Sequence, residues 1–289
     1  MVTTAFDILV TAMTDLGLLT AGEIDTTVAH TTVHTETRQS SARAWKGGTM
    51  FVLEADAAAP EKEWAKISAS SFDSATGKTT YTTSAFTAVL ASGDKIALSS
   101  SKYPIDEMLL VLNRALSSLG EIPLVDDTLS GVTGQSEYSL PSGIGGRNLR
   151  RVFVTGDVDS TGDMRWTENV MWRSVPATAG AVSTLIFRNY PDAGETIRLV
   201  YMGSHPACYA SSSAISDYVA RERLVAEFNY RFFLWAKRRG TDMDEIGWDL
   251  NEATAAVEYA RKRWPIGDPG TPFKPVMSPI RTHSGGRVT

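Results

Sequence analysis

The chain has 289 residues, 43% hydrophobic and 21% charged, proportions of an ordinary globular protein that exclude global disorder. Its net charge of −5 and the lack of a dense Lys/Arg run argue against tight binding of nucleic acid, which normally uses a basic patch. Cys208 is the only cysteine, so an internal disulfide and a multi-thiolate zinc site are excluded. No apolar run reaches the roughly 18 residues that span a bilayer, so we expect no membrane contact.

A short helix is predicted at the N-terminus, within residues 1–20. Thr4 and Asp7 have the spacing of a capping box, in which each residue binds the backbone of the other. Apolar residues then follow at helical spacing, and Gly17 supplies a stop.

Residues 21–103 are predicted to form a small β-rich module. The Thr-rich stretch Thr26–Thr37 indicates a loop or an irregular edge strand. Runs of strand-forming residues separated by turn signals follow it between residues 47 and 99. The expected strands are Thr49–Ala55, Trp64–Ser70, Lys78–Thr83 and Lys95–Ser99.

Residues 104–124 are predicted to contain a bundle helix. Pro104 suits its first position, and Asp106 and Glu107 complement the positive end of the helix dipole. Gly120 should end the helix, and Pro123 should prevent it from restarting.

Residues 125–210 contain several short strand candidates separated by glycine-rich turns. This pattern is typical of an antiparallel sandwich or small barrel, rather than of a parallel sheet with crossover helices. The expected strands are Glu137–Leu140, Leu149–Thr155, Met164–Ser174, Val182–Tyr190 and Thr196–Tyr201.

Residues 211–264 are predicted to form a long helical hairpin. Ser212 or Ser213 would cap the first helix, which runs to about Arg239. Thr241 and Asp244 would form a capping box for the second helix. Each helix would be about 35–40 Å long, and the short turn between them would make the pair antiparallel.

Aromatic residues crowd the first helix of this hairpin. Phe228, Phe232 and Trp235 fall at helical spacing, and Trp264 ends the second helix. Such rings can stack on bases, but at this spacing they more often form a core or a contact between subunits. We therefore treat these four residues as candidates for a subunit or portal contact.

The last segment, residues 265–289, is rich in Pro, Gly and Ser and cannot form a helix or a central strand. It has a basic surplus from Lys274, Arg281 and Arg287. It is either a disordered end or an extended arm that becomes ordered on a partner. Prolines reduce the entropy lost on holding a chain extended, which favours the arm and adds Phe273 and these three basic residues to the contact candidates.

One segment partly matches a calcium-binding loop. Asp157, Asp159, Thr161 and Glu168 occupy ligand positions of an EF-hand pattern. The flanking residues are predicted strands, however, whereas an EF-hand loop lies between helices. We therefore expect an acidic hairpin tip, no bound metal and no cofactor.

The stretch Leu109-Leu-Val-Leu-Asn-Arg-Ala-Leu-Ser-Ser-Leu-Gly-Glu-Ile-Pro-Leu-Val125 resembles a segment of tailed-bacteriophage head–tail adaptor proteins, the tail tubular A-type family. The hairpin is similar as well, with Glu227-Phe-Asn-Tyr-Arg-Phe-Phe233 in its first helix and an acidic-to-basic second helix from Asp242 to Arg263. This resemblance covers residues 104–264 and leaves the N-terminal module as an addition.

The resemblance implies an α+β fold, in which an antiparallel helical bundle carries an inserted antiparallel β-sandwich or barrel domain. An N-terminal β-rich module and an extended C-terminal arm would complete the chain. It further implies a structural virion protein of the neck and no enzyme, a head–tail connector made in the host cytoplasm. Its expected partners are the portal protein, neighbouring adaptor subunits in a homo-oligomeric ring (a dodecamer), the tail tube or nozzle protein, and genomic DNA that passes through the lumen without sequence-specific binding.

Other functions remain open from the sequence. The chain could be another tail or neck component, such as a tail completion or baseplate protein, which differs from an adaptor in ring symmetry. It could instead be a carbohydrate- or receptor-binding module, with Trp166, Trp172 and Tyr190 as a sugar platform.

Overall fold

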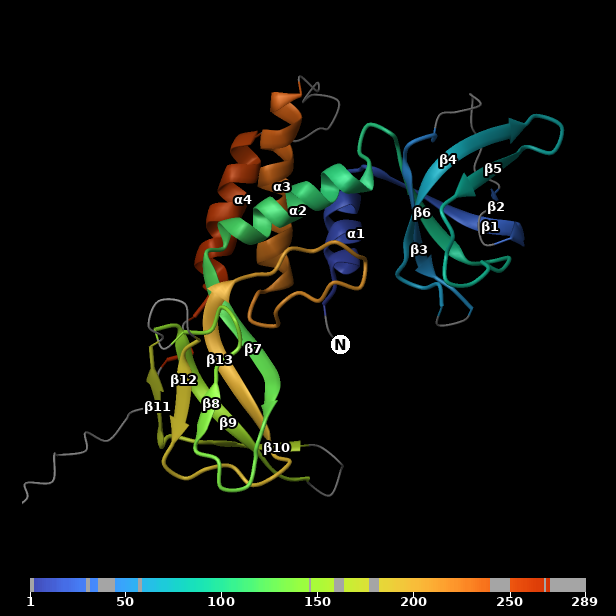
Figure 1. Cartoon of the computed structure of the whole chain (residues 1–289). Coiled ribbons are helices and arrows are strands. Elements are labelled where there is room, and N and C mark those ends of the chain that lie inside the picture. The colour runs from blue at the N-terminus through green and yellow to red at the C-terminus, as the bar shows by residue number, and fades with distance from the viewer. Residues whose placement is uncertain are drawn as a thin grey trace, which may run out of the picture. The chain divides into compact units, whose positions relative to one another are not determined.

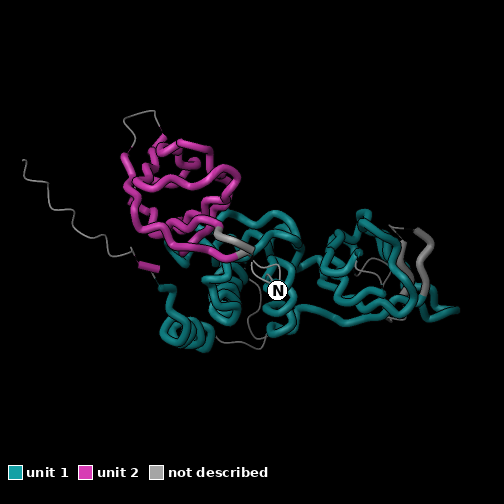
Figure 2. The backbone as a smooth tube through the Cα atoms, turned by 90° about the horizontal axis from the view of Figure 1, so that it is seen from below, with its two compact units in different colours: residues 1–122, 204–267 teal, residues 123–203, 268–289 magenta. Residues whose placement is uncertain are grey.

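The computed structural model describes residues 3–29, 32–35, 45–56, 59–145, 147–158, 164–176, 182–239, 250–267 and 269–270. Helices and antiparallel sheets are both present, which confirms the α+β class (Figure 1). The chain divides into two compact units (Figure 2). Residues 1–122 and 204–267 form the helix-containing unit, and residues 123–203 with 268–289 form the β unit.

Helix α1, Ala5–Asp15, begins with the predicted capping box. The Asp7 carboxylate accepts a hydrogen bond from the Thr4 backbone N–H at 2.9 Å, and the Thr4 hydroxyl accepts one from the Asp7 N–H at 3.4 Å. Burial raises the pKa of Asp7, but the hydrogen bonds from Thr4 and the Lys62 ammonium at 3.1 Å outweigh burial and lower the pKa overall.

The N-terminal β module is a closed barrel with the strand order β1-β2-β5-β4-β3-β6. Apolar side chains that point inward from these strands form its core, centred on Met50, Ile67 and Tyr81. The strands are β1 (Leu19–Ala29), β2 (Thr32–Thr35), β3 (Thr49–Glu54), β4 (Trp64–Asp73), β5 (Lys78–Thr83) and β6 (Lys95–Ser99).

The Thr-rich stretch differs from the prediction because its described residues close this barrel. β1 pairs with β6 on one side and, across two register shifts, with β2 on the other, and β2 pairs in turn with β5. Neither β1 nor β2 is therefore an edge strand. Threonine is β-branched and favours strands when neighbouring strands supply hydrogen bonds and packing. Outside the barrel, the α1 residue Phe6 contacts Phe51 and Trp64, with ring centroids 6.0 and 6.3 Å away.

Helix α2 spans Ile105–Ser118, with Pro104 as its extended N-cap and not as its first helical residue. The helix ends at the predicted stop, because its C-cap Leu119 is followed by Gly120 with a φ of +76°. The rest of the segment 104–124 begins strand β7 at Glu121. Pro123 lies in this strand and is tolerated there because β7 is at an edge of its sheet.

The β unit contains two antiparallel sheets with the orders β10-β9-β13-β7 and β11-β12-β8. Side chains from both sheets, including Val152, Trp172 and Leu185, form one buried cluster. The predicted single strand Met164–Ser174 is in fact two strands that lie in different sheets. The strands are β7 (Glu121–Ser130), β8 (Glu137–Ser139), β9 (Leu149–Val158), β10 (Met164–Glu168), β11 (Trp172–Val175), β12 (Thr184–Phe187) and β13 (Thr196–Ser204).

The hairpin helices are α3, Arg221–Arg238, and α4, Leu250–Arg263. The predicted start of the first helix near Ser212 is wrong, because residues 212–220 are not helical and the Ile215 N–H donates to the Thr3 carbonyl. With 18 residues, α3 is about 27 Å long, shorter than expected. The predicted cap at Thr241 and Asp244 lies outside the described residues.

Candidate interaction groove on the helices

The aromatic residues of α3 form the core of the helical part. Phe228 and Phe232 are fully buried and Trp235 is nearly so. Phe232 contacts Phe228, Phe233, Trp235 and Tyr103, with ring centroids 5.6–6.5 Å apart. These rings pack inside the chain itself, which corrects the expectation that Phe228, Phe232 and Trp235 form a contact surface.

A buried carboxylate joins three helices. Glu227 of α3 is 0% exposed and accepts two hydrogen bonds from the Arg261 guanidinium of α4, at 2.6 and 3.0 Å. The Ser118 hydroxyl at the end of α2 donates a third at 3.2 Å. Arg223 of α3 also donates a hydrogen bond to the Trp264 carbonyl, which follows α4, at 2.9 Å. This bond and the two between Arg261 and Glu227 hold α3 and α4 as an antiparallel pair.

A groove of about 570 Å³ lies where α1, α3 and α4 meet, and we call it the helical groove. Its surface is mostly apolar, and the side chains along it include the small residues Ala226, Ala256 and Ala260. Small side chains allow another backbone to approach closely. The other lining residues are Thr11, Asp15, Arg221, Glu222, Val225, Asn229, Tyr259 and Trp264.

Asn229 is the unusual residue of the helical groove. It is 4% exposed, yet among the described residues nothing donates a hydrogen bond to its Oδ1 atom. A buried amide oxygen without a donor costs about 1–3 kcal/mol, so such groups are rare in native proteins and call for an explanation. A donor supplied by a bound partner would remove this cost.

Two aromatic rings border the same groove. Tyr259 is 63% exposed, and its ring meets that of Trp264 edge to face with centroids 6.3 Å apart. Trp264 is half-buried, and of the four aromatic contact candidates that the structure describes it is the one at a surface hollow. Exposed aromatic residues beside an apolar groove are typical of protein contact sites.

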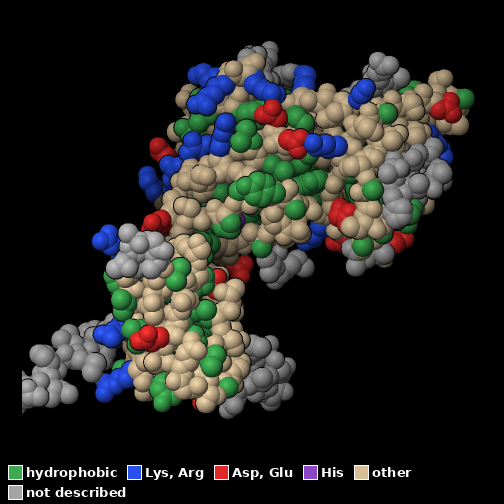
Figure 3. Space-filling view, viewed as in Figure 1, with side chains coloured by type: hydrophobic (Ala, Val, Ile, Leu, Met, Phe, Trp, Pro, Cys, Tyr) green, Lys and Arg blue, Asp and Glu red, His purple; other side chains and the backbone are tan. Residues whose placement is uncertain are grey.

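The hairpin helices are basic although the whole chain is acidic. Residues 221–239 contain six basic and two acidic side chains, and residues 250–263 contain three basic and two acidic ones. Figure 3 shows Lys and Arg side chains gathered in the upper left of the view, over the part of the molecule that Figure 1 labels α3 and α4.

The remaining contact candidates, Phe273, Lys274, Arg281 and Arg287, lie outside the described residues.

Of the calcium candidates, the structure describes only the Glu168 side chain. Glu168 pairs with Phe153 in the β9–β10 hairpin and lies 3.8 Å from Arg151. The Asp157 side chain, Asp159 and Thr161 lie outside the described part of the chain.

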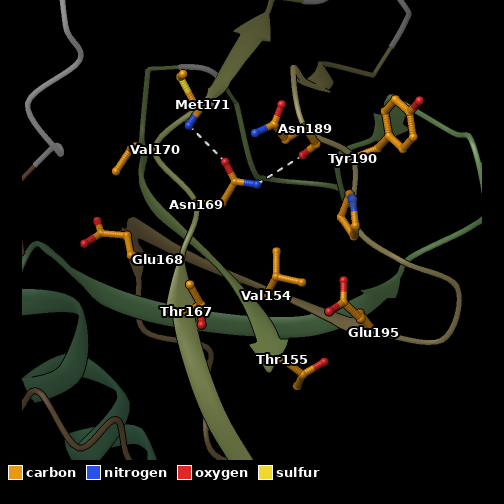
Figure 4. A pocket seen from close by; sticks show the side chains of 11 residues that line it. Val154, Thr155, Thr167, Glu168, Asn169, Val170, Met171, Asn189, Tyr190 and Glu195 are labelled. Carbon is orange, nitrogen blue, oxygen red and sulfur yellow. Dashed lines mark hydrogen bonds between the residues drawn. The ribbon is translucent and has the colours of Figure 1, made fainter. Parts of the chain in front are cut away.

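A second hollow, of about 420 Å³, lies in the β unit (Figure 4), and we call it the β pocket. Its central amide is already in use: Asn169 accepts from the Met171 N–H at 2.9 Å and donates to the Asn189 carbonyl at 3.3 Å. Glu195 likewise accepts from the Asp192 N–H at 2.6 Å. These polar groups hold the loops of the pocket in place and are therefore less available to a ligand.

The predicted sugar platform is not assembled either. Trp172 is buried in the core of the β unit. The Arg198 guanidinium covers the Trp166 ring at 3.7 Å and is itself held by Asp127 at 2.6 and 2.8 Å. Tyr190 alone of the three is exposed, at the edge of the β pocket.

Sequence reasoning missed the helical groove, because the pattern of α3 does not reveal that Asn229 is buried without a donor. Within the described ranges, no group of three or more His, Cys, Asp or Glu residues could hold a metal, and no helix is long and apolar enough to cross a membrane. Comparison with protein-family models, curated proteins and solved structures found no match for this chain.

Proposed function

We propose that this chain is a structural subunit of a tailed-bacteriophage head–tail adaptor, which assembles into a ring between the portal and the tail. The observation that carries the proposal is the helical groove, an apolar hollow with an exposed tyrosine and a buried amide that lacks a donor. Such a surface is incomplete in the isolated chain, and in a ring a neighbouring subunit would complete it.

The order of the elements supports the same proposal. Helix α2, the β unit, and the α3–α4 pair follow one another over residues 104–264, in the order expected from the resemblance to adaptor proteins. In this proposal the helices are the antiparallel bundle of an adaptor subunit, and the two sheets of the β unit are its inserted β-sandwich. The barrel is an added module.

The charge distribution is compatible with a wall around DNA. An acidic chain repels the phosphate backbone, and like charges would let DNA pass without sticking. The basic surplus of α3 and α4 would then face a protein neighbour or the portal, and not the lumen. The proposal assigns the chain a place in the virion neck and no catalytic step.

Particle mass and symmetry test this function. The unmodified protein is examined by native mass spectrometry and negative-stain imaging, alone and after addition of purified portal rings. We expect rings of about twelve copies, either free or formed only on the portal. Six-fold particles would indicate a tail completion protein instead, and three-fold particles a fibre component. A chain that stays monomeric beside portal rings would overturn the proposal.

A further inference from the structure

The chain contains a segment whose chemistry fits the helical groove. Pro269, Pro272 and Pro275 recur at every third residue in Pro269-Gly-Thr-Pro-Phe-Lys-Pro275, which we call the proline segment. A polyproline II helix has three residues per turn, so this spacing would put Pro272 and Pro275 on one face. Gly270 has a φ of +75°, outside the polyproline II region, so such a helix could begin only after it. Segments of this kind bind grooves lined by aromatic residues, because they are extended before they bind.

The helical groove offers the matching contacts. Tyr259 and Trp264 provide aromatic surface, and the alanines beside them leave room for a backbone. The backbone N–H groups of a polyproline II helix form no internal hydrogen bonds and are free to donate. Asn229 also lines the groove, and its Oδ1 atom is buried without a donor among the described residues.

The helices that form the groove are basic overall, but two of the three charged residues that line it, Asp15 and Glu222, are acidic and exposed. Lys274 lies inside the proline segment, and Arg281 follows it. Arg221, the basic residue of the groove, is already engaged by the Thr11 hydroxyl and the Asp7 carbonyl of α1.

We propose that the helical groove of one subunit binds the proline segment of a second copy of this chain. Residues 268–289 group with the β unit of their own chain and not with the helices that form its groove. The proline segment then reaches into the groove of a neighbour. This inference rests on the proposed ring, in which the same contact between groove and segment joins each subunit to the next.

Photocrosslinking of the full chain tests the contact. The Phe273→p-benzoylphenylalanine variant is prepared in light and ¹⁵N-labelled forms, mixed, irradiated with and without portal rings, and analysed by mass spectrometry. We expect crosslinks between light and heavy chains that map to the groove-lining parts of α3 and α4. Crosslinks confined to single chains would overturn the second copy as the occupant, and an absence of groove crosslinks would overturn the contact itself.

A matched pair of variants distinguishes specific binding in the groove from nonspecific binding to exposed aromatic side chains. In the crosslinking chain, Tyr259→Ala should lower the yield about tenfold, which corresponds to about 1.4 kcal/mol. Tyr209→Ala removes another exposed tyrosine, outside the groove, and should leave the yield unchanged. Equal yields from the two variants would contradict the inference.

Ring assembly distinguishes this inference from the proposed function. If the unmodified chain forms rings and a chain that ends at Gly270 forms them equally well, the ring proposal stands and the contact between groove and segment is wrong. If the unmodified chain forms no rings even with the portal, the proposed function is wrong, and the light–heavy crosslinks still decide whether two copies meet at the groove.

Discussion

The helical groove and the β pocket are both surface hollows with a tyrosine at the edge, but their polar groups are used differently. In the β pocket, Asn169 is bonded to the backbone on both of its polar atoms. In the helical groove, the Asn229 oxygen is buried and has no donor within the described chain. The Asn169 amide is therefore satisfied within one chain and the Asn229 oxygen is not, although the Glu168 Oε1 atom of the β pocket is also buried without a hydrogen bond, 3.8 Å from the Arg151 guanidinium.

Side chains that are paired or covered within the chain stabilise its fold, whereas unpaired or uncovered side chains are available to a partner. In the β unit, Trp166 is covered by Arg198 of the same chain. Near the helical groove, Tyr259 remains mostly exposed, while both oxygens of the nearby Glu227 are paired with Arg261. Both hollows contain an exposed tyrosine and a buried oxygen without a hydrogen bond, but only the helical groove has a mostly apolar surface, which is the reason to seek a contact there.

The largest expected effect distinguishes the buried rings of α3 from the exposed ring at the groove. Phe232→Ala should destabilise the chain by about 4 kcal/mol, because it leaves a cavity among four aromatic neighbours. Tyr259→Ala should change stability by less than about 0.5 kcal/mol, as a surface substitution does. Urea unfolding followed by circular dichroism measures both. Similar losses would mean that Tyr259 belongs to the core.

A second effect compares an ion pair of the helices whose carboxylate is fully buried with an ion pair of the β unit whose carboxylate is partly exposed. Arg261→Met should cost about 3 kcal/mol, because the Glu227 carboxylate then stays buried without its partner. Arg198→Met breaks a pair of similar geometry with Asp127 that is partly exposed, and should cost about 1 kcal/mol.

The same unfolding measurement checks this pair of variants, and the double variant Glu227→Leu with Arg261→Met serves as the control. It should recover most of the loss caused by Arg261→Met, because no buried charge remains. A double variant as unstable as the single one would show that packing, and not the uncompensated charge, dominates at this site.

Two asparagine substitutions should shift stability in opposite directions. Asn229→Leu removes a buried oxygen without a donor and should stabilise the free chain by about 1 kcal/mol. Asn169→Leu breaks two hydrogen bonds and should destabilise it by about 1–2 kcal/mol. Differential scanning calorimetry of the two variants shows whether each melting temperature rises or falls relative to the unmodified chain. A destabilising Asn229→Leu would contradict the view that this amide lacks a partner.

The smallest effect concerns the capping box of α1. The hydrogen bonds of Asp7 hold its folded pKa below the usual 3.8, so its contribution is present above about pH 4 and is lost as pH falls through the folded pKa. Asp7→Asn should therefore cost about 1 kcal/mol at pH 7 and less at pH 3. Urea unfolding at the two pH values measures this, and an equal cost at both would exclude the charge as the cause.

Local signals predicted much of the fold. The capping box at Thr4, the helix near Pro104 and the strand Lys78–Thr83 follow from short-range patterns, which the structure confirms. Strand β1 was missed because it lacks an alternating apolar pattern and is held by its partners β2 and β6. The early start assigned to α3 has a related cause: Ile215 and Val219 have helical spacing and are buried, but they lie in a non-helical segment.

The candidate site was harder to predict than the fold. The sequence identified the aromatic stripe of α3 but left open whether it faces inward or outward, and Phe228 and Phe232 are inside. It also could not show that Asn229, one turn of helix before Phe233, would be buried beside Tyr259 of another helix. Both properties depend on how α1, α3 and α4 pack, which no local pattern contains.

Hydroxyl-radical footprinting tests most directly whether the groove is covered on assembly. Tyr259 and Tyr190 are similarly exposed in the free chain, at 63% and 55%, so each serves as a reference for the other. The free protein and the protein assembled on portal rings are oxidised in parallel and compared by mass spectrometry. We expect oxidation of Tyr259 to fall severalfold on assembly while oxidation of Tyr190 changes little. Unchanged oxidation of Tyr259, with or without protection of Tyr190, would contradict the assignment of the helical groove as the contact between subunits.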